Sequence, residues 1–193
     1  DSDNTALRFY GGDLLGNLWR FDTDNRVPPA GTEARLLGQA RAADNTTIQP
    51  ITTKPVLTEI RAGTGKVAVV AFGTGRFLDE SDLSDATLQS IYAVKDSGTS
   101  LANFRTANVV PNSIIVKDAV TRSTTDACVD WATQDGWYVD LNPDNESPGE
   151  RINLDPQLVQ GTLLVVSNVP NNNTCTVGGD SWIYQFNYKC GKF

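Results

Sequence analysis

The sequence predicts an all-β protein, and more narrowly a β-propeller of which this chain forms roughly three to four blades. One type of strand occurs three times, within residues 10–22, 89–96 and 178–187. In the first and last of these, a turn of Gly, Asp or Asn residues adjoins a strand that carries several aromatic residues. Recurrence of one strand type at intervals of several tens of residues is typical of propellers, in which each blade is a repeated sheet.

Strand signals are frequent along the chain, whereas helix signals are scarce. Short segments rich in Val, Ile, Thr, Tyr, Phe and Trp are bounded by Gly, Pro, Asn and Asp, as β-strands usually are. Only residues 82–89 favour a turn or two of helix, with Ser81 or Asp82 as its cap. The expected strands span residues 7–10, 18–22, 35–37, 54–60, 66–73, 89–95, 113–120, 136–141, 151–154, 162–169 and 181–188.

Two groups of three strands have the pattern expected of blades. In each group the middle strand is the most continuously apolar, which suits an interior strand covered on both faces. Pro55 and Pro156 lie in the first strand of their groups, where a missing ladder donor is best tolerated at an edge. The groups are residues 51–60, 66–73 and 89–95, and residues 150–158, 162–169 and 181–188, with 114–119 and 136–141 as candidate outer strands.

The chain length predicts a single partial propeller domain over residues 1–193. A four-stranded blade takes about 40 to 50 residues, and propellers close with about four to eight blades. An open arc leaves unpaired strand edges. We therefore expect the segment to belong to a larger propeller, or to close by packing on itself or on another copy.

Charge and composition exclude several classes of function. The net charge of −7 and the pI near 4.5 disfavour binding to nucleic acid, and no cluster of Lys and Arg would bind anionic lipid. The apolar runs are strand-sized and too short to span a membrane. The chain has no histidine, which removes the commonest general base and the commonest metal ligand. We expect no catalytic residues, no metal site and no enzymatic activity.

Three cysteines, Cys128, Cys175 and Cys190, lie in the last third of the chain, and none has the spacing of a zinc or redox motif. A disulfide is the natural interpretation for an extracellular protein. Cys175 and Cys190 flank an extended strand of about eight residues, which would hold them too far apart to bond. The sequence therefore favours a structural disulfide between Cys128 and Cys175, which leaves Cys190 free or bonded outside the segment. Three unpaired thiols are the alternative.

The aromatic residues, glycines and acidic clusters each allow a structural and a functional interpretation. The aromatic side chains of the repeated strands are expected to pack in and between blades rather than to stack on a ligand. Paired glycines match no phosphate-binding motif, so turns or bulges explain them better. Acidic clusters at residues 22–25, 79–85 and 144–146 are expected to be solvated loops. Asp1 and Asp3 alternate as calcium ligands do, but Leu7 stands where a further carboxylate is expected.

With these residues in hand, the chain resembles the C-terminal propeller region of the PilY/PilC family, the tip-associated adhesins and assembly factors of type IV pili. The matching segments occur in the family's order and span nearly the whole chain. They are residues 10–22 (YGGDLLGNLWRFD), 51–57 (ITTKPVL), 72–78 (FGTGRFL), 90–96 (SIYAVKD), 136–141 (GWYVDL), 149–151 (GER), 160–170 (QGTLLVVSNVP) and 175–188 (CTVGGDSWIYQFNY).

The resemblance implies the C-terminal part of a longer protein, located outside the cell or at the bacterial surface. It implies a non-enzymatic binding module that acts in pilus assembly and surface attachment. The implied partners are pilus components such as minor pilins, or a host or abiotic surface. Many relatives carry a calcium loop just before the first hairpin, and Asp1 and Asp3 resemble its end. We expect no cofactor in this segment, whereas the full-length protein could bind Ca²⁺.

Two other functions compete with this interpretation. A quinoprotein dehydrogenase would also carry repeated Gly and Trp blade motifs, but it needs a quinone held by Ca²⁺ and a full set of repeats. A structural subunit of an extracellular assembly would instead associate with itself through unpaired blade edges. An absorption band of bound quinone would identify the first, and the mass of the protein over a dilution series would identify the second.

Overall fold

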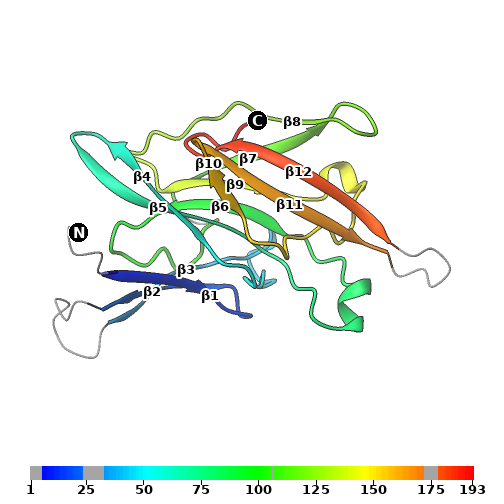
Figure 1. Ribbon diagram of the computed structural model, residues 1–193, viewed down its shortest axis with the longest axis horizontal. Coiled ribbons are helices and arrows are strands. Elements are labelled where there is room, and N and C mark those ends of the chain that lie inside the picture. Colours follow the sequence, from blue (N-terminus) through cyan, green and yellow to red (C-terminus); the bar gives the residue numbers. More distant parts are fainter. Residues whose placement is uncertain (1–5, 24–32, 106, 172–177) are drawn as a thin grey trace.

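The computed structural model describes residues 6–23, 33–105, 107–171 and 178–193. The first of its sheets is an antiparallel meander in the order β1-β2-β3, at the lower left of Figure 1. Its strands are β1 (Arg8–Gly12), β2 (Asn17–Asp22) and β3 (Ala34–Gln39). The hairpin predicted over residues 10–22 is thus present as β1 and β2, with Gly12 opposite Leu18.

The second sheet holds six strands, and the third is another meander of three. The second sheet has the order β4-β5-β6-β9-β7-β8, in which only β7 runs parallel to its neighbour β9. The third sheet has the order β10-β11-β12. Their bounds are β4 (Val56–Ala62), β5 (Gly65–Gly73), β6 (Ser90–Lys95), β7 (Val109–Val116), β8 (Arg122–Thr124), β9 (Gly136–Asp140), β10 (Gln157–Val159), β11 (Thr162–Pro170) and β12 (Gly179–Asn187).

The middle strands of the second sheet, β5 and β6, are buried on both faces because a separate hydrophobic core lies against each. Val69 and Ala71 of β5 join the core shared with the third sheet, whereas Val70 and Phe72 join the core shared with the first. Alternate side chains of a strand point to opposite faces, so a strand between two cores must be apolar throughout. The continuous apolar run at residues 66–73 predicted a strand covered on both faces, and β5 confirms this prediction.

The corresponding prediction for β11 is only half right. Its buried side chains, Leu163, Val165 and Ser167, alternate with half-buried ones, so one face is packed and the other is not. The outer strand predicted at residues 136–141 is present as β9, which pairs with β6 and completes a four-stranded unit with β4 and β5. The described strands thus confirm the all-β prediction, with three face-packed sheets as its blades.

The helix predicted over residues 82–89 is wrong. A single 3₁₀ turn, η1 (Glu80–Ser84), begins earlier and is capped by Asp79. The side chain of Asp85 accepts the N–H of Thr87 at 2.9 Å, which stabilises a turn instead of a continued helix. The strand predicted over residues 151–154 is reduced to one bridge between Arg151 and Asn168. No helix in the described segments is long and apolar enough to cross a membrane.

The predicted Cys128–Cys175 disulfide is also wrong, because Cys128 bonds to Cys190. Their Cα atoms lie 4.2 Å apart, and 62 positions separate them in the sequence. Cys175 lies outside the described residues. Cys190 was expected to be free or bonded outside the segment, but the turn after β12 brings it to Cys128.

A turn after β12 and the amide of Asn112 bring the two cysteine segments together. Gly191 adopts a φ of +70° and donates its N–H to the carbonyl of Asn187, which reverses the chain beside Cys190. Asn112 of β7 is buried, and its Nδ2 donates to the carbonyls of Ala127 at 3.0 Å and of Cys190 at 3.1 Å. The side chain of Asn112 therefore holds Ala127, the neighbour of Cys128, close to the backbone of Cys190, so that the disulfide can form.

We predict that Cys190→Ser lowers the free energy of unfolding by about 2–4 kcal/mol, because the unfolded chain loses a long-range crosslink. Urea denaturation without reductant measures this loss. Cys175→Ser is the matched control and should leave the unfolding midpoint unchanged, since this residue takes no part in the bond. An equal loss in the control would contradict the observed pairing.

Candidate functional site

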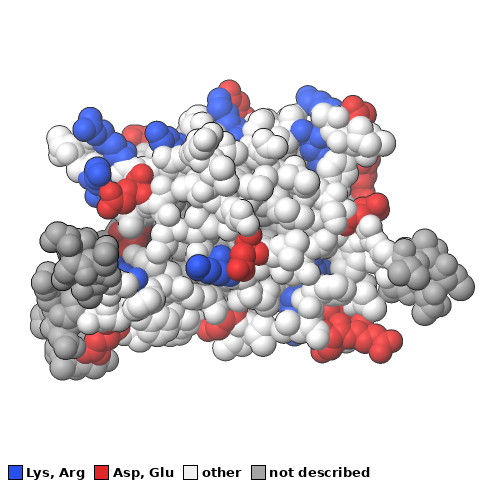
Figure 2. Space-filling model, in the orientation of Figure 1, with Lys and Arg blue, Asp and Glu red and all other residues white. Residues whose placement is uncertain are grey.

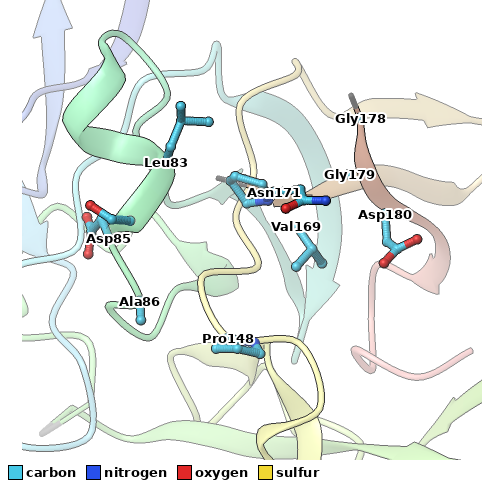
Figure 3. Close-up of a pocket in the computed structure, with 11 residues that line it drawn as sticks. Leu83, Asp85, Ala86, Pro148, Val169, Asn171, Gly178, Gly179 and Asp180 are labelled. Atoms are coloured by element: carbon cyan, nitrogen blue, oxygen red, sulfur yellow. The ribbon is translucent and has the colours of Figure 1, made fainter. Parts of the chain in front are cut away.

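A groove of about 590 Å³ lies between η1 and the facing ends of β11 and β12. Figure 3 shows Leu83 and Asp85 on one side of this groove and Val169, Asn171 and Asp180 on the other. Residues 83–86 form the first wall, and residues 169–171 and 178–180 form the second, with Pro148 between them. The two walls come from parts of the chain that lie about half its length apart, so the groove depends on tertiary packing.

The wall that contains η1 is shaped by two aspartates of the acidic cluster. The carboxylate of Asp79 accepts the N–H of Ser81 at 2.7 Å and so caps the turn. The side chain of Asp82 is fully buried and accepts the N–H of Leu78 at 2.8 Å and the Nε of Arg76 at 2.7 Å. The sequence predicted solvated loops here, and for Asp82 that prediction is wrong.

Arg151 fastens the two walls to each other. Its guanidinium donates to three carbonyl oxygens of the first wall's segment, those of Arg76 and Asp82 at 2.8 Å and that of Asp85. Its backbone exchanges two hydrogen bonds with Asn168 of β11. Burial lowers the pKa of Arg151, although the charges of Asp85 and Asp82 act in the opposite direction. A buried arginine with this many acceptors holds the groove in one shape.

The groove and the segment beside it carry negative charge at neutral pH, because Asp85 and Asp180 line the groove and Asp79 lies next to it. Hydrogen bonds from Ser81 lower the pKa of Asp79. Burial raises the pKa of Asp82, but the hydrogen bonds from Leu78 and Arg76 outweigh it, and the resulting pKa lies below the ordinary 3.8. Acidic side chains also gather at the lower right of Figure 2, over the position of η1 in Figure 1. Carboxylates with lowered pKa stay ionised and attract cationic groups.

Exposed apolar side chains border the charged groove. Phe77 and Leu78 are 44% and 66% exposed, and Leu154 is 50% exposed. Phe77, Leu83 and Leu154 line an adjoining hollow of about 420 Å³ that also touches the start of β12. Large apolar side chains that cluster on a surface beside charged ones are typical of sites that bind another molecule. The arrangement can therefore bind a segment that is both basic and apolar.

The aromatic residues predicted to be structural are only partly buried in the two cores. Tyr92, Trp137, Tyr184 and Phe186 are each at most 2% exposed, as that prediction requires. Trp19, Tyr138 and Trp182 are half-buried, and Phe21 is 42% exposed, so for Phe21 the prediction is wrong. Asp1 and Asp3 lie outside the described residues, so the calcium expectation stays untested there. No group of three or more acidic, cysteine or histidine side chains that could hold a metal ion occurs within the described ranges.

Sequence reasoning missed the roles of Arg151, Phe77 and Leu154 at this site. Arg151 belongs to a short GER motif that was noted only for its resemblance to relatives. Phe77 and Leu78 directly precede the acidic cluster, and this apolar pair beside a cap residue was the available signal. Leu154 reaches the adjoining hollow because the Arg151–Asn168 bridge joins its loop to β11, and no local pattern encodes this contact.

Comparison with known proteins gives relatives along nearly the whole chain. The chain is 33% identical over 194 residues and 30% identical over 196 residues to two type IV pilus biogenesis factor PilY1 homologs of Xylella fastidiosa. It is 27% identical over 238 residues to type IV pilus biogenesis factor PilY1 of Pseudomonas aeruginosa. These alignments cover 95–97% of this chain but only 13–20% of the relatives. No family model matches the chain.

The fold also has a solved counterpart. The crystal structure of the Pseudomonas aeruginosa PilY1 C-terminal domain superposes with a TM-score of 0.72 and 24% sequence identity, over 94% of this chain and 43% of that chain. The fold is therefore that of a partial β-propeller module, as the sequence predicted. The 30% and 33% identity to the two Xylella fastidiosa relatives over 95–96% of this chain goes further, and the chain belongs to the PilY/PilC family.

We predict that Asp82→Asn destabilises the protein by about 1–3 kcal/mol at neutral pH, because a buried charge-assisted acceptor is lost and an amide N–H₂ faces the N–H of Leu78. The folded pKa of Asp82 lies below its ordinary 3.8, so this carboxylate stabilises the fold above that pH. The contribution is lost as pH falls from 3.8 through the folded pKa.

Thermal unfolding measured from neutral pH down to about pH 2 tests both parts of this prediction. The Asp82→Asn protein should melt lower at neutral pH and lose less stability on acidification than the wild type. Asp126→Asn is the control, because its carboxylate is 72% exposed. A wild-type pH dependence in the Asp82→Asn protein would contradict the assignment.

Proposed function

We propose that this chain is a non-enzymatic, extracellular binding module that acts in type IV pilus assembly and surface attachment. The relatives are type IV pilus biogenesis factors, and this supports the pilus role. The chain spans less than a quarter of their length, so it is one part of such a function. The disulfide between Cys128 and Cys190 suits an oxidising, extracellular compartment.

The acidic groove beside η1 is the surface that we assign to partner binding. The carboxylates of Asp85 and Asp180 line it. The exposed Phe77, Leu78 and Asp79 lie beside it, on the segment whose carbonyls Arg151 holds in place. A rigid site loses little conformational entropy when it binds, so its contacts convert efficiently into affinity. The partner that fits is a pilus component, such as a minor pilin, that presents a basic and apolar segment.

The state of the carboxylates supports binding rather than catalysis. A carboxyl group that acts as a general acid near neutral pH needs a raised pKa, as burial beside another anion would give. The pKa values of Asp79, Asp82 and Asp85 are all lowered. These groups therefore remain proton acceptors and anionic contacts at neutral pH. The quinoprotein alternative gains no specific support from the described residues.

We predict that Leu78→Lys, introduced into the full-length pilus protein, reduces surface attachment and twitching and weakens binding of purified minor pilins by about tenfold or more. The new ammonium group would replace an apolar contact and repel a basic partner. Binding of the wild type should weaken as salt is added, because screening reduces attraction between the exposed charges.

Leu15→Lys is the matched control for this variant. Leu15 is a leucine of similar exposure, 60% against 66%, but it lies in the turn between β1 and β2, far from η1 in the chain. Circular dichroism should show that both variants fold and melt as the wild type does. If Leu78→Lys binds and attaches as Leu15→Lys does, the groove is not the partner site.

A further inference from the structure

The hydrogen bonds of β11 decide which backbone groups of β12 point outward, at the edge of the third sheet. Asn168 of β11 exchanges both of its backbone hydrogen bonds with Arg151, at 2.9 and 2.8 Å, so its N–H and C=O point away from β12. Ser181 lies opposite Asn168 in the register. Because bonded and non-bonded pairs alternate in an antiparallel ladder, Ser181 and every second residue after it direct their backbone groups away from β11.

Three consecutive outward-facing positions of β12 are left open. Asn187 follows the same alternation, and its outward N–H donates to the carbonyl of Lys192 at 2.7 Å. The outward groups of Ser181, Ile183 and Gln185 have no backbone hydrogen bond to another segment within the described residues. The edge of this nine-residue strand therefore offers three N–H donors and three C=O acceptors in a row.

This edge also lacks the devices that usually prevent strands from pairing. The register of β12 against β11 runs through nine pairs without a bulge, and the strand contains no proline, lysine or arginine. On the face that carries Ser181, Ile183 and Gln185 the exposed side chains are uncharged, and Ile183 is 68% exposed. The exposed carboxylate of Asp180, near the start of the strand, belongs to the opposite face. A long, regular edge with an uncharged exposed face is a template for another strand.

The other edges in the described structure are protected in ways that β12 is not. The edge of β3 is covered by a loop, since Leu101 and Phe104 donate their N–H groups to the carbonyls of Leu37 and Gln39. The exposed face of β4 carries the charges of Glu59 and Arg61. β8 and β10 are only three residues long, and β1 contains two adjacent glycines. The contrast marks β12 as the one long edge of this kind in the described part.

We propose that β12 pairs with β12 of a second copy of this chain, in an antiparallel arrangement centred on Ile183. A two-fold axis there places Ile183 opposite the second copy's Ile183 and Ser181 opposite its Gln185. All three pairs are then of the hydrogen-bonded type, so each outward donor and acceptor of the edge finds a partner. The symmetry closes the contact on itself, so it yields a dimer and not a fibre.

The side chains in this register are complementary between two identical strands. The exposed face gains an apolar Ile–Ile pair flanked by neutral Ser–Gln pairs, and no like charges face each other directly. Asp180 of one copy comes to lie opposite Phe186 of the other copy. The open edge ends at the next residue, Asn187, whose N–H donates to the carbonyl of Lys192. An unrelated strand would have to supply such a match by chance, whereas a second copy supplies it by symmetry.

Open space beside the edge allows another strand to approach. A hollow of about 600 Å³ borders the first half of the edge and is lined by Val120, Ser181, Trp182 and Ile183. Val120, in the turn between β7 and β8, is 83% exposed. A second hollow of about 480 Å³ borders the other half at Gln185. The first hollow is also lined by Val169 and Asp180 of the groove's second wall, whereas the first wall, residues 83–86, takes no part in the pairing. The pairing of β12 can therefore hold even if the partner site beside η1 fails, and the reverse.

Sedimentation equilibrium of the 193-residue chain over a dilution series tests the proposal. The weight-average mass should rise from 20.9 kDa towards twice that value and level off there. Added salt should strengthen the association, because each copy carries a net charge of −7. Ile183→Lys should weaken it by about tenfold or more, because two ammonium groups replace the central apolar pair.

Two further variants separate association from folding. Ile183→Thr keeps a β-branched side chain, so it should fold normally and weaken the dimer less than Ile183→Lys does. Leu57→Lys changes a 47% exposed leucine on the edge strand β4 and should dimerise as the wild type does. A wild type that stays at 20.9 kDa throughout, or that grows beyond twice this mass, would overturn the proposal.

Amide hydrogen exchange gives a readout specific to the register. The N–H groups of Ser181, Ile183 and Gln185 should exchange fast in the dilute protein and slowly in the concentrated one. Those of Trp182 and Tyr184 already bond to β11 and should be slow at both concentrations. Dimerisation with unchanged exchange at the three alternate amides would place the contact elsewhere and refute this pairing.

Discussion

Buried arginines at the junctions between sheets constrain the whole structure. The Arg20 side chain of the first sheet is 8% exposed and bonds to the buried carboxylate of Asp96, directly after β6 of the second. Between the second and third sheets, Arg122 of β8 bonds to the buried Glu150, which also accepts the hydroxyl hydrogen of Tyr184 on β12. Removing one partner of such a pair leaves an unpaired buried charge and typically costs about 3–5 kcal/mol. The sheets are thereby fixed in orientation as well as held by apolar packing.

A buried arginine also fixes the groove, but here Arg151 joins a loop, and not a second sheet, to β11. Its guanidinium binds backbone carbonyls and no carboxylate, so it fixes the path of residues 76–85 whatever side chains that path displays. The side chains of Asp79 and Phe77 can therefore face solvent while hydrogen bonds from Arg151 hold the backbone of their segment. Surface loops positioned by a rigid scaffold commonly carry binding function, and here a single buried side chain supplies the rigidity.

Local pattern was enough to predict most of the strands, whereas the disulfide and the groove depend on contacts distant in sequence. The helix expected at residues 82–89 fails for a local reason, the turn stabilised by the side chain of Asp85. The apolar run of β5 predicted a strand covered on both faces, because side chains of one strand alternate between two cores. The run in β11 is nearly as apolar, yet what covers its second face is decided outside the strand. The Cys128–Cys190 bond depends on Asn112, which lies 16 and 78 positions from the two residues it unites. The groove depends on Arg151 in the same manner, and hydrophobic periodicity carries no signal for either.

The third sheet carries both of the surfaces that we assign to binding, and the geometry of β12 explains why. Its first residues form a wall of the groove, whereas its middle residues form the open edge, and Asp180 lies where the two meet. The inner face of the same strand packs Tyr184 and Phe186 into the main core. The side chains of a strand point to its two faces, whereas its backbone N–H and C=O groups point to its edge. One segment can therefore contact the core, a partner and a second copy at once. Val169 and Asp180 line both the groove and the hollow beside the open edge, so a partner segment seated in the groove and a second copy paired at the edge would be direct neighbours.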